Sequence, residues 1–228
     1  MESSDIELMG AEESAIGMTE SEIMYHYDGY EHVPKHVTHV TVGPSITVIP
    51  SSEFQFRYSL TTIELPDGLN TIGEMAFSGC HALKSINIPS TITEVDARAF
   101  QCCRSLRNIS LPEGLLELGE RAFFGCYRLK TIHIPPMIQI IESETFWGCL
   151  DLTEVILPLS LEQIKESAFE GCESLQSIDF PTSLRVVETS AFRRTGLNEF
   201  NLPNSVEICG TIFSDCKCTN LRVPEFLF

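Results

Sequence analysis

The chain has 228 residues, and its 32 Asp and Glu outnumber its 15 Lys and Arg, which gives a net charge of −17. Binding to nucleic acid releases counterions through clustered basic residues, so this charge argues against nucleic acid as the main partner. It argues equally against a basic anchor on an anionic membrane. Hydrophobic residues make up 43% of the chain, which is enough for a core. The sequence contains no run of 18 or more apolar residues, so no membrane-spanning helix is predicted.

The start of the chain is acidic and has neither the basic nor the apolar region of a signal peptide. We therefore expect an intracellular protein, cytoplasmic or nuclear. Residues 1–22 lack periodicity and are expected to form an acidic, disordered tail. Residues 23–36 contain Asp28-Gly29 between tyrosines, a pair favoured in tight hairpin turns, and are interpreted as an N-terminal cap.

A period of 23 residues organises the remainder, residues 37–228, into about eight coils. Four residue types recur with this period: phenylalanine, leucine, proline and cysteine. Such self-similarity is the mark of a repeat array, in which units too small to fold alone stack and share a core. The phenylalanine column is Phe54, Phe77, Phe100, Phe123, Phe146, Phe169 and Phe192, and the cysteine column is Cys80, Cys103, Cys126, Cys149, Cys172 and Cys216.

One unit, LKSINIPSTITEVDARAFQCCRSL (Leu83–Leu106), shows the plan of a coil. Its LxxIxIP segment alternates apolar and polar residues like a short strand, which proline then ends. The stretch 96–103 is too short for a full helix, so we expect a helical turn in which Phe100 fills the core. Stacked strands then form a parallel sheet, and the fold class is an α/β solenoid.

This unit resembles the BspA-type leucine-rich repeats. The resemblance implies a right-handed coil with its parallel sheet on a concave face, short helical turns or loops elsewhere, and a binding scaffold without a reaction. It also leaves open surface adhesion, the role of bacterial members of the family. Two coils depart from the pattern, with Arg57 in the cysteine column and Arg194-Thr195 where the glycine and cysteine should stand.

The cysteines are interpreted as small buried thiols, because no secretion signal accompanies them. A metal site is not expected, since the cysteine spacing offers no CxxC pair. His32, His36 and His39 have a helical spacing in a segment that alternates like a strand, so they should not converge. A metal-binding accessory module remains a remote alternative, and no cofactor is expected.

Ser110, His133 and Glu154 fall on successive strands and have the residue types of a catalytic triad. A triad also needs an oxyanion hole and a pocket that excludes water, which an open strand ladder does not provide. The chain also lacks GxxxxGK[ST], GxGxxG and HExxH motifs. We therefore expect a protein that is not an enzyme.

Repeat arrays bind partners through extended faces, so the outward strand positions are the predicted binding site for a protein or peptide. Polar residues dominate these positions early in the array, and acidic residues gather later. The predicted partner-binding residues are Asn108, Ser110, His133, Glu154, Ile156, Asp179 and Glu199. A second candidate patch consists of Phe124 and Trp147, which occupy the same register next to the phenylalanine column. The partner's identity and the oligomeric state are not readable from these residues.

Overall fold

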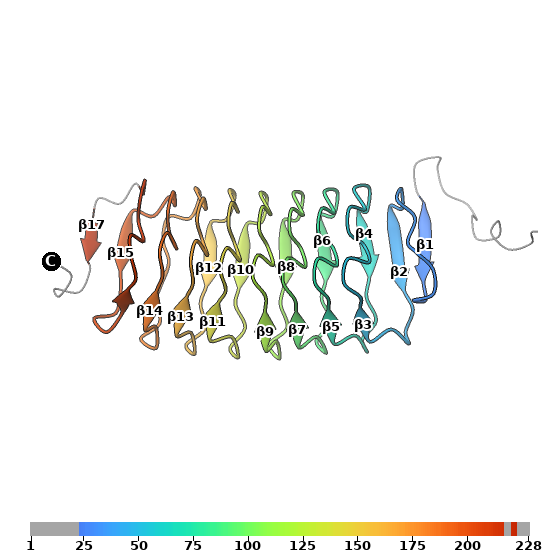
Figure 1. Ribbon diagram of the computed structural model, residues 1–228, viewed down its shortest axis with the longest axis horizontal. Coiled ribbons are helices and arrows are strands. Elements are labelled where there is room, and N and C mark those ends of the chain that lie inside the picture. The colour runs from blue at the N-terminus through green and yellow to red at the C-terminus, as the bar shows by residue number, and fades with distance from the viewer. Residues whose placement is uncertain (1–22, 217–219, 223–228) are drawn as a thin grey trace, which may run out of the picture.

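The computed structural model describes residues 23–216 and 220–222, which form a rod of stacked coils (Figure 1). Two rows of short strands run along this rod, and every pairing between strands is parallel. The predicted tail, residues 1–22, lies outside the described residues. The front row consists of β1 (Met24–Tyr27), β2 (His39–Val42), β4 (Thr62–Glu64), β6 (Ser85–Asn87), β8 (Asn108–Ser110), β10 (Thr131–His133), β12 (Glu154–Ile156), β15 (Glu199–Asn201) and β17 (Asn220–Arg222).

The rear row has eight strands of two residues each, and they mark seven turns of the solenoid. Paired residues in this row lie 23 positions apart through most of the array, for example Ile72 with Val95. The predicted parallel solenoid with a 23-residue repeat is therefore confirmed. The rear strands are β3 (Val48–Ile49), β5 (Thr71–Ile72), β7 (Glu94–Val95), β9 (Glu117–Leu118), β11 (Ile140–Ile141), β13 (Gln163–Ile164), β14 (Val186–Val187) and β16 (Glu207–Ile208).

The core lies between the two rows and is built from ladders of identical residues. Each of the seven phenylalanines of the column is fully buried. Their rings stack with centroids 5.2–5.6 Å apart and planes within 11° of parallel. One coil alone would expose its ring on both faces, so neighbouring coils stabilise one another.

Around the phenylalanines, no helix occurs among the residues that the structure describes, so the expected helical turns and the α/β assignment are not confirmed. Positions two before and two after the ring have positive φ, as in Arg121 (57°) and Gly125 (67°) around Phe123. This alternation turns every second amide towards the next coil: Phe123 N donates to Thr145 O at 2.9 Å and Gly125 N to Trp147 O at 2.7 Å. The turns thus form a third ladder of hydrogen bonds, which we call the turn row.

The cysteine column binds one coil to the one before it. The Cys103 thiol donates to Phe77 O at 3.2 Å and the Cys126 thiol to Phe100 O at 3.2 Å. Five of the six cysteines are buried and Cys216 is partly exposed. In the coil that lacks the cysteine, the buried Thr195 hydroxyl donates to Phe192 O of its own coil at 2.8 Å, so it takes the place of the thiol without repeating the bond to the preceding coil.

The N-terminal cap differs from the predicted hairpin. Strand β1 pairs with β2 in parallel and thus continues the front row, although Gly29 does adopt a positive φ of 85° in the turn that follows β1. Tyr27 packs edge-on against Phe54 with centroids 5.4 Å apart, and so covers the exposed end of the phenylalanine ladder. Arg57 donates through Nε to Val33 O at 2.9 Å, which explains an arginine in the cysteine column.

Candidate partner-binding surface

The front row, which strand pairing divides into four sheets, places part of the predicted binding site on its outward face. In β8, β10 and β12 the middle side chain is buried and its two neighbours are exposed. This alternation brings His133 directly beside Ile156, and Glu154 beside Thr131, on paired strands β10 and β12. Ile156 is 47% exposed, which is unusual for isoleucine on an otherwise polar face. His133, Glu154 and Ile156 therefore form the centre of the front patch.

The other predicted residues extend this patch in both directions. Asn108 and Ser110 are exposed on β8, which contacts β10. Asp179 is exposed in a segment without strand hydrogen bonding, and Glu199 is exposed on β15. The acidic half of the front patch thus spans the coil between β12 and β15, in which residues 177–179 do not form a front-row strand.

The triad-like residues do not form a catalytic arrangement in the described part of the chain. No hydrogen bond links Ser110, His133 and Glu154, and each side chain is exposed. An exposed serine without a bonded base is not activated as a nucleophile. The three side chains lie on an open polar surface.

The second patch is present as a close aromatic pair. Phe124 and Trp147 stack with centroids 4.5 Å apart and planes 7° from parallel, and both rings are half-buried on the turn row. They follow the buried Phe123 and Phe146 by one residue, and therefore project to the outside of the array. Because aromatic pairs of this kind supply much of the affinity at interfaces, the patch stays a candidate anchor.

The histidines of the cap do not converge on a metal. His26 Nε2 lies 3.0 Å from Asp28 Oδ1, and His39 Nδ1 lies 2.9 Å from the hydroxyl of its neighbour Thr38. Within residues 23–216, no group of three or more His, Cys, Asp or Glu side chains is placed to hold a metal ion.

Sequence reasoning missed two surface features. Phe56, Tyr58 and His81 form an exposed aromatic cluster, with Tyr58 and His81 centroids 4.9 Å apart. The rear row is interrupted between β9 and β11. The signal for the second lies in the repeat itself, because Met137 occupies the position where other coils have a small residue, either glycine (Gly68, Gly114) or a hydroxyl residue (Thr91, Ser160).

Stacked 23-residue coils with parallel strand rows, a phenylalanine ladder and an open polar face define a leucine-rich-repeat solenoid. The family model "BspA type Leucine rich repeat region" matches residues 33–149 and 94–222. The chain belongs to this family, as its repeat pattern predicts. None of the curated proteins compared with the chain matches it.

Solved structures show the same architecture. A leucine-rich repeat protein from Bacteroides ovatus is 31% identical with a TM-score of 0.74, and the match covers 76% of this chain and 45% of that one. The T. pallidum Leucine Rich Repeat protein is 26% identical with a TM-score of 0.68, over 78% of this chain and 84% of that one. The chain therefore spans less than half the length of the B. ovatus protein.

The comparisons overturn the predicted intracellular location. A leucine rich cell surface protein from Faecalibacterium prausnitzii has this fold, with 22% identity, a TM-score of 0.60 and coverage of 90% of this chain and 73% of that one. The prediction of an intracellular location rested on the absence of a signal-peptide pattern, and it is wrong. No helix in the described ranges has the length and apolar character needed to cross a membrane.

Proposed function

We propose that the array is a non-catalytic scaffold that binds a protein or peptide through the front patch. The observation that carries this proposal is the juxtaposition of His133, Ile156 and Glu154 on two paired strands, with an exposed apolar side chain between polar ones. An apolar centre with a charged rim is the usual anatomy of a protein interface. The parallel ladder holds these side chains at fixed spacing, so a partner would not have to order them.

The partner would approach the acidic half of the patch. Glu154, Asp179 and Glu199 are exposed there, and among the described residues none of the three has an ion-pair partner. Complementary charge steers association and fixes the register of a partner. A segment that carries an apolar anchor next to basic or hydrogen-bonding groups would match this surface.

The test is an affinity capture from lysate of the source cells with wild type and the His133→Ala/Asp179→Arg variant. Both substitutions lie on exposed positions, so the variant should keep the fold and lose the partner by about thirtyfold or more, the effect expected for an interface centre. The Glu207→Arg variant on the rear row is a matched charge control and should retain the partner. Capture of the same proteins by the folded front variant would refute the front patch.

Adhesion at a cell surface is a second candidate function. It is favoured by the fold shared with the F. prausnitzii protein that is described as a cell surface protein. The same two variants distinguish it when the bait is incubated with intact host cells or extracellular matrix in place of lysate. Binding there, lost by the front variant, would favour adhesion.

A further inference from the structure

The rear row has one interruption in its described strands, and it divides the row into two sheets. Sheet β3-β5-β7-β9 and sheet β11-β13-β14-β16 are each continuous. Hydrogen bonds join the coils on both sides of the gap: Leu116 N donates to Thr93 O and Glu162 N to Gln139 O, each at 2.8 Å. The corresponding bonds from Gln139 N to Leu116 O and from Glu142 N to Leu118 O are absent, as is the pairing of β9 with β11.

The coil of β11 differs in sequence from its neighbours next to the gap. In other coils a hydroxyl at one position bonds the coil before it: Thr91 Oγ1 donates to Leu69 O at 2.5 Å, and Ser160 Oγ to Pro136 O at 2.6 Å. Gly68 and Gly114 occupy this position in the coils of β5 and β9, which pair with the coils before them, so a missing hydroxyl alone does not open the row. Met137, in the coil of β11, is the one large apolar side chain in this register between residues 68 and 183. On the other side, Gly119 lies so close to the preceding coil that a Cβ there would be 2.4 Å from Ala97 N. The coil of β9 thus contacts the coil of β7 closely, whereas the main-chain hydrogen bonds from the coil of β11 to it are missing.

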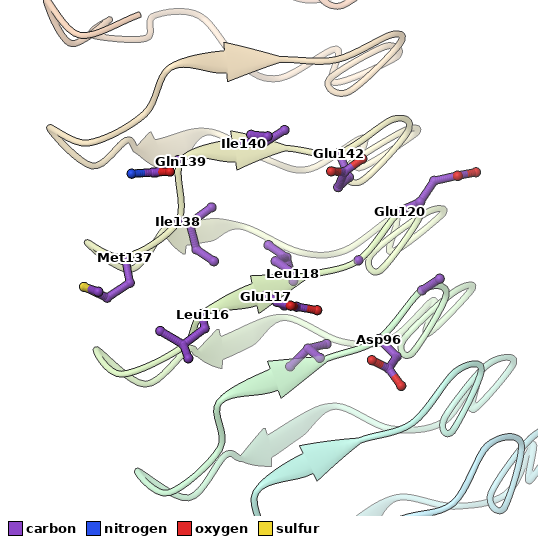
Figure 2. A pocket seen from close by; sticks show the side chains of 13 residues that line it. Asp96, Leu116, Glu117, Leu118, Glu120, Met137, Ile138, Gln139, Ile140 and Glu142 are labelled. Atoms are coloured by element: carbon purple, nitrogen blue, oxygen red, sulfur yellow. The ribbon is translucent and has the colours of Figure 1, made fainter.

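A cavity of about 460 Å³ opens at this gap, within the range of ligand pockets (Figure 2). Three of its apolar side chains are exposed to solvent: Leu116 at 54%, Met137 at 56% and Ile140 at 37%. The main-chain carbonyls of Leu116 and Leu118 face an edge without a neighbouring strand. An open strand edge beside apolar side chains is the arrangement to which an extended peptide adds.

The rim of the cavity is acidic. Asp96, Glu117, Glu120 and Glu142 line it, and no lysine or arginine does. Glu142 is paired with Lys165 at 2.7 Å and Glu120 with Arg121 at 3.6 Å, whereas the described residues provide no ion-pair partner for Asp96 or Glu117. Burial and the neighbouring carboxylates of Glu94 and Glu117 raise the pKa of Asp96 above its usual value. Two of the four rim carboxyl groups, those of Asp96 and Glu117, thus have no cationic partner within the described part of the chain.

We propose that this cavity, which we call the rear cleft, binds an extended segment of a partner polypeptide in which Lys or Arg alternates with aliphatic residues. The aliphatic side chains would pack on Leu116, Met137 and Ile140, and the cation would pair with Asp96 and Glu117. The peptide main chain would use the open carbonyls and amides of the gap. This site lies on the rear row and is independent of the front patch of the proposed function.

Electrostatic charge favours a basic segment of a partner over two other occupants of the cleft, the chain's own N-terminal segment and a second copy of the chain. Residues 1–22 contain seven acids and no base, so like charges oppose the chain's own N-terminal segment in the cleft. A second copy carries the same net charge of −17, which opposes self-association through an acidic rim. A basic segment would pair with the carboxylates of both Asp96 and Glu117, and such charge-assisted hydrogen bonds are stronger than those between neutral groups.

The test is a methyl NMR titration of the full chain with two end-capped peptides, Ac-Leu-Lys-Val-Arg-Leu-Thr-NH₂ and Ac-Leu-Glu-Val-Glu-Leu-Thr-NH₂. The basic peptide should shift the methyl signals of Met137, Ile138 and Ile140 saturably, and the acidic peptide should not. Glu117→Lys should weaken the basic peptide by about tenfold or more. Glu207→Lys, also on the rear row but outside the cleft, should leave its affinity unchanged.

Three results would overturn the proposal: no saturable shift up to millimolar basic peptide, equal response to both peptides, or concentration-dependent shifts of these methyls without peptide, which would identify a second copy. Signals from Ile156 report the front patch separately. The His133→Ala/Asp179→Arg variant should bind the basic peptide like wild type, so failure of the front patch and failure of the rear cleft give different results.

Discussion

Replacing Phe123 by alanine is expected to lower the free energy of unfolding by about 3–5 kcal/mol, the cost of removing a large buried aromatic side chain. Phe123 is fully buried and stacks between Phe100 and Phe146 at 5.5 and 5.6 Å, so both neighbouring coils lose a contact. The local structure cannot collapse into the hole, because the turn row fixes the spacing between coils. Denaturant unfolding followed by circular dichroism measures the change.

The adjacent Phe124→Ala variant is the matched control. Phe124 is half-buried and stacks only on Trp147, so its loss should cost less than about 2 kcal/mol. The same chemical change one residue along therefore separates the core side of the turn row from its outer side. Equal destabilisation by both variants would mean that the phenylalanine ladder is not the core of the array.

The buried Cys80 is expected to react with iodoacetamide about a thousandfold more slowly in the folded protein than in the unfolded chain, and the buried Cys103 and Cys126 should also be slowed. Burial raises the pKa of the Cys80 thiol from 9.0 to about 12, and burial likewise raises the pKa of Cys103 and Cys126. Only the thiolate attacks, and three pKa units lower its fraction about a thousandfold. Mass spectrometry of peptides from protein alkylated at pH 8 measures each site.

The raised pKa values also set a direction for stability. The folded state keeps these thiols protonated, whereas the unfolded chain ionises them from about pH 9 upwards. Their contribution to the free energy of unfolding is therefore complete below pH 9 and is lost progressively as the pH rises towards 12.

In the alkylation experiment, rapid labelling of Cys126 in the folded protein would contradict the buried cysteine column. In denaturant, all these thiols should react alike.

The period of the sequence predicts the coil and its core, because identical residues at a fixed spacing can only stack in register. The conformation of the turns around Phe100 and Phe123 is harder to predict from the sequence. Their length and composition suit a helical turn. Instead, the backbone alternates between positive and negative φ, which lets its amides bond to the next coil. A single repeat does not reveal this, because the bonds join two coils. Gly125, Gly148 and Gly171 at one of the positive-φ positions carried that signal.

The cap and the rear cleft show a second limit. Asp28-Gly29 favours a hairpin locally, yet β1 gains a full set of parallel pairings by joining the front row. The rear cleft lies where Met137 places a large apolar side chain in a register otherwise held by glycine, threonine and serine, and where Gly119 lies close to the coil on the other side. Such a gap depends on the balance between two neighbouring coils, and only an alignment of the repeats with one another exposes Met137 as the odd residue.

The measurement that tests this account most directly is amide hydrogen exchange across the central coils. Coil stacking predicts slow exchange for Leu116, Gly119, Glu162 and Lys165, whose amides donate to the preceding coil at 2.8–2.9 Å. Gln139 and Glu142 should exchange about a hundredfold faster or more, because local opening energies fall from the global value towards zero where such bonds are missing. Uniform protection of all six amides would show that the rear row is continuous and would remove the rear cleft, and uniform fast exchange would contradict the stacked solenoid itself.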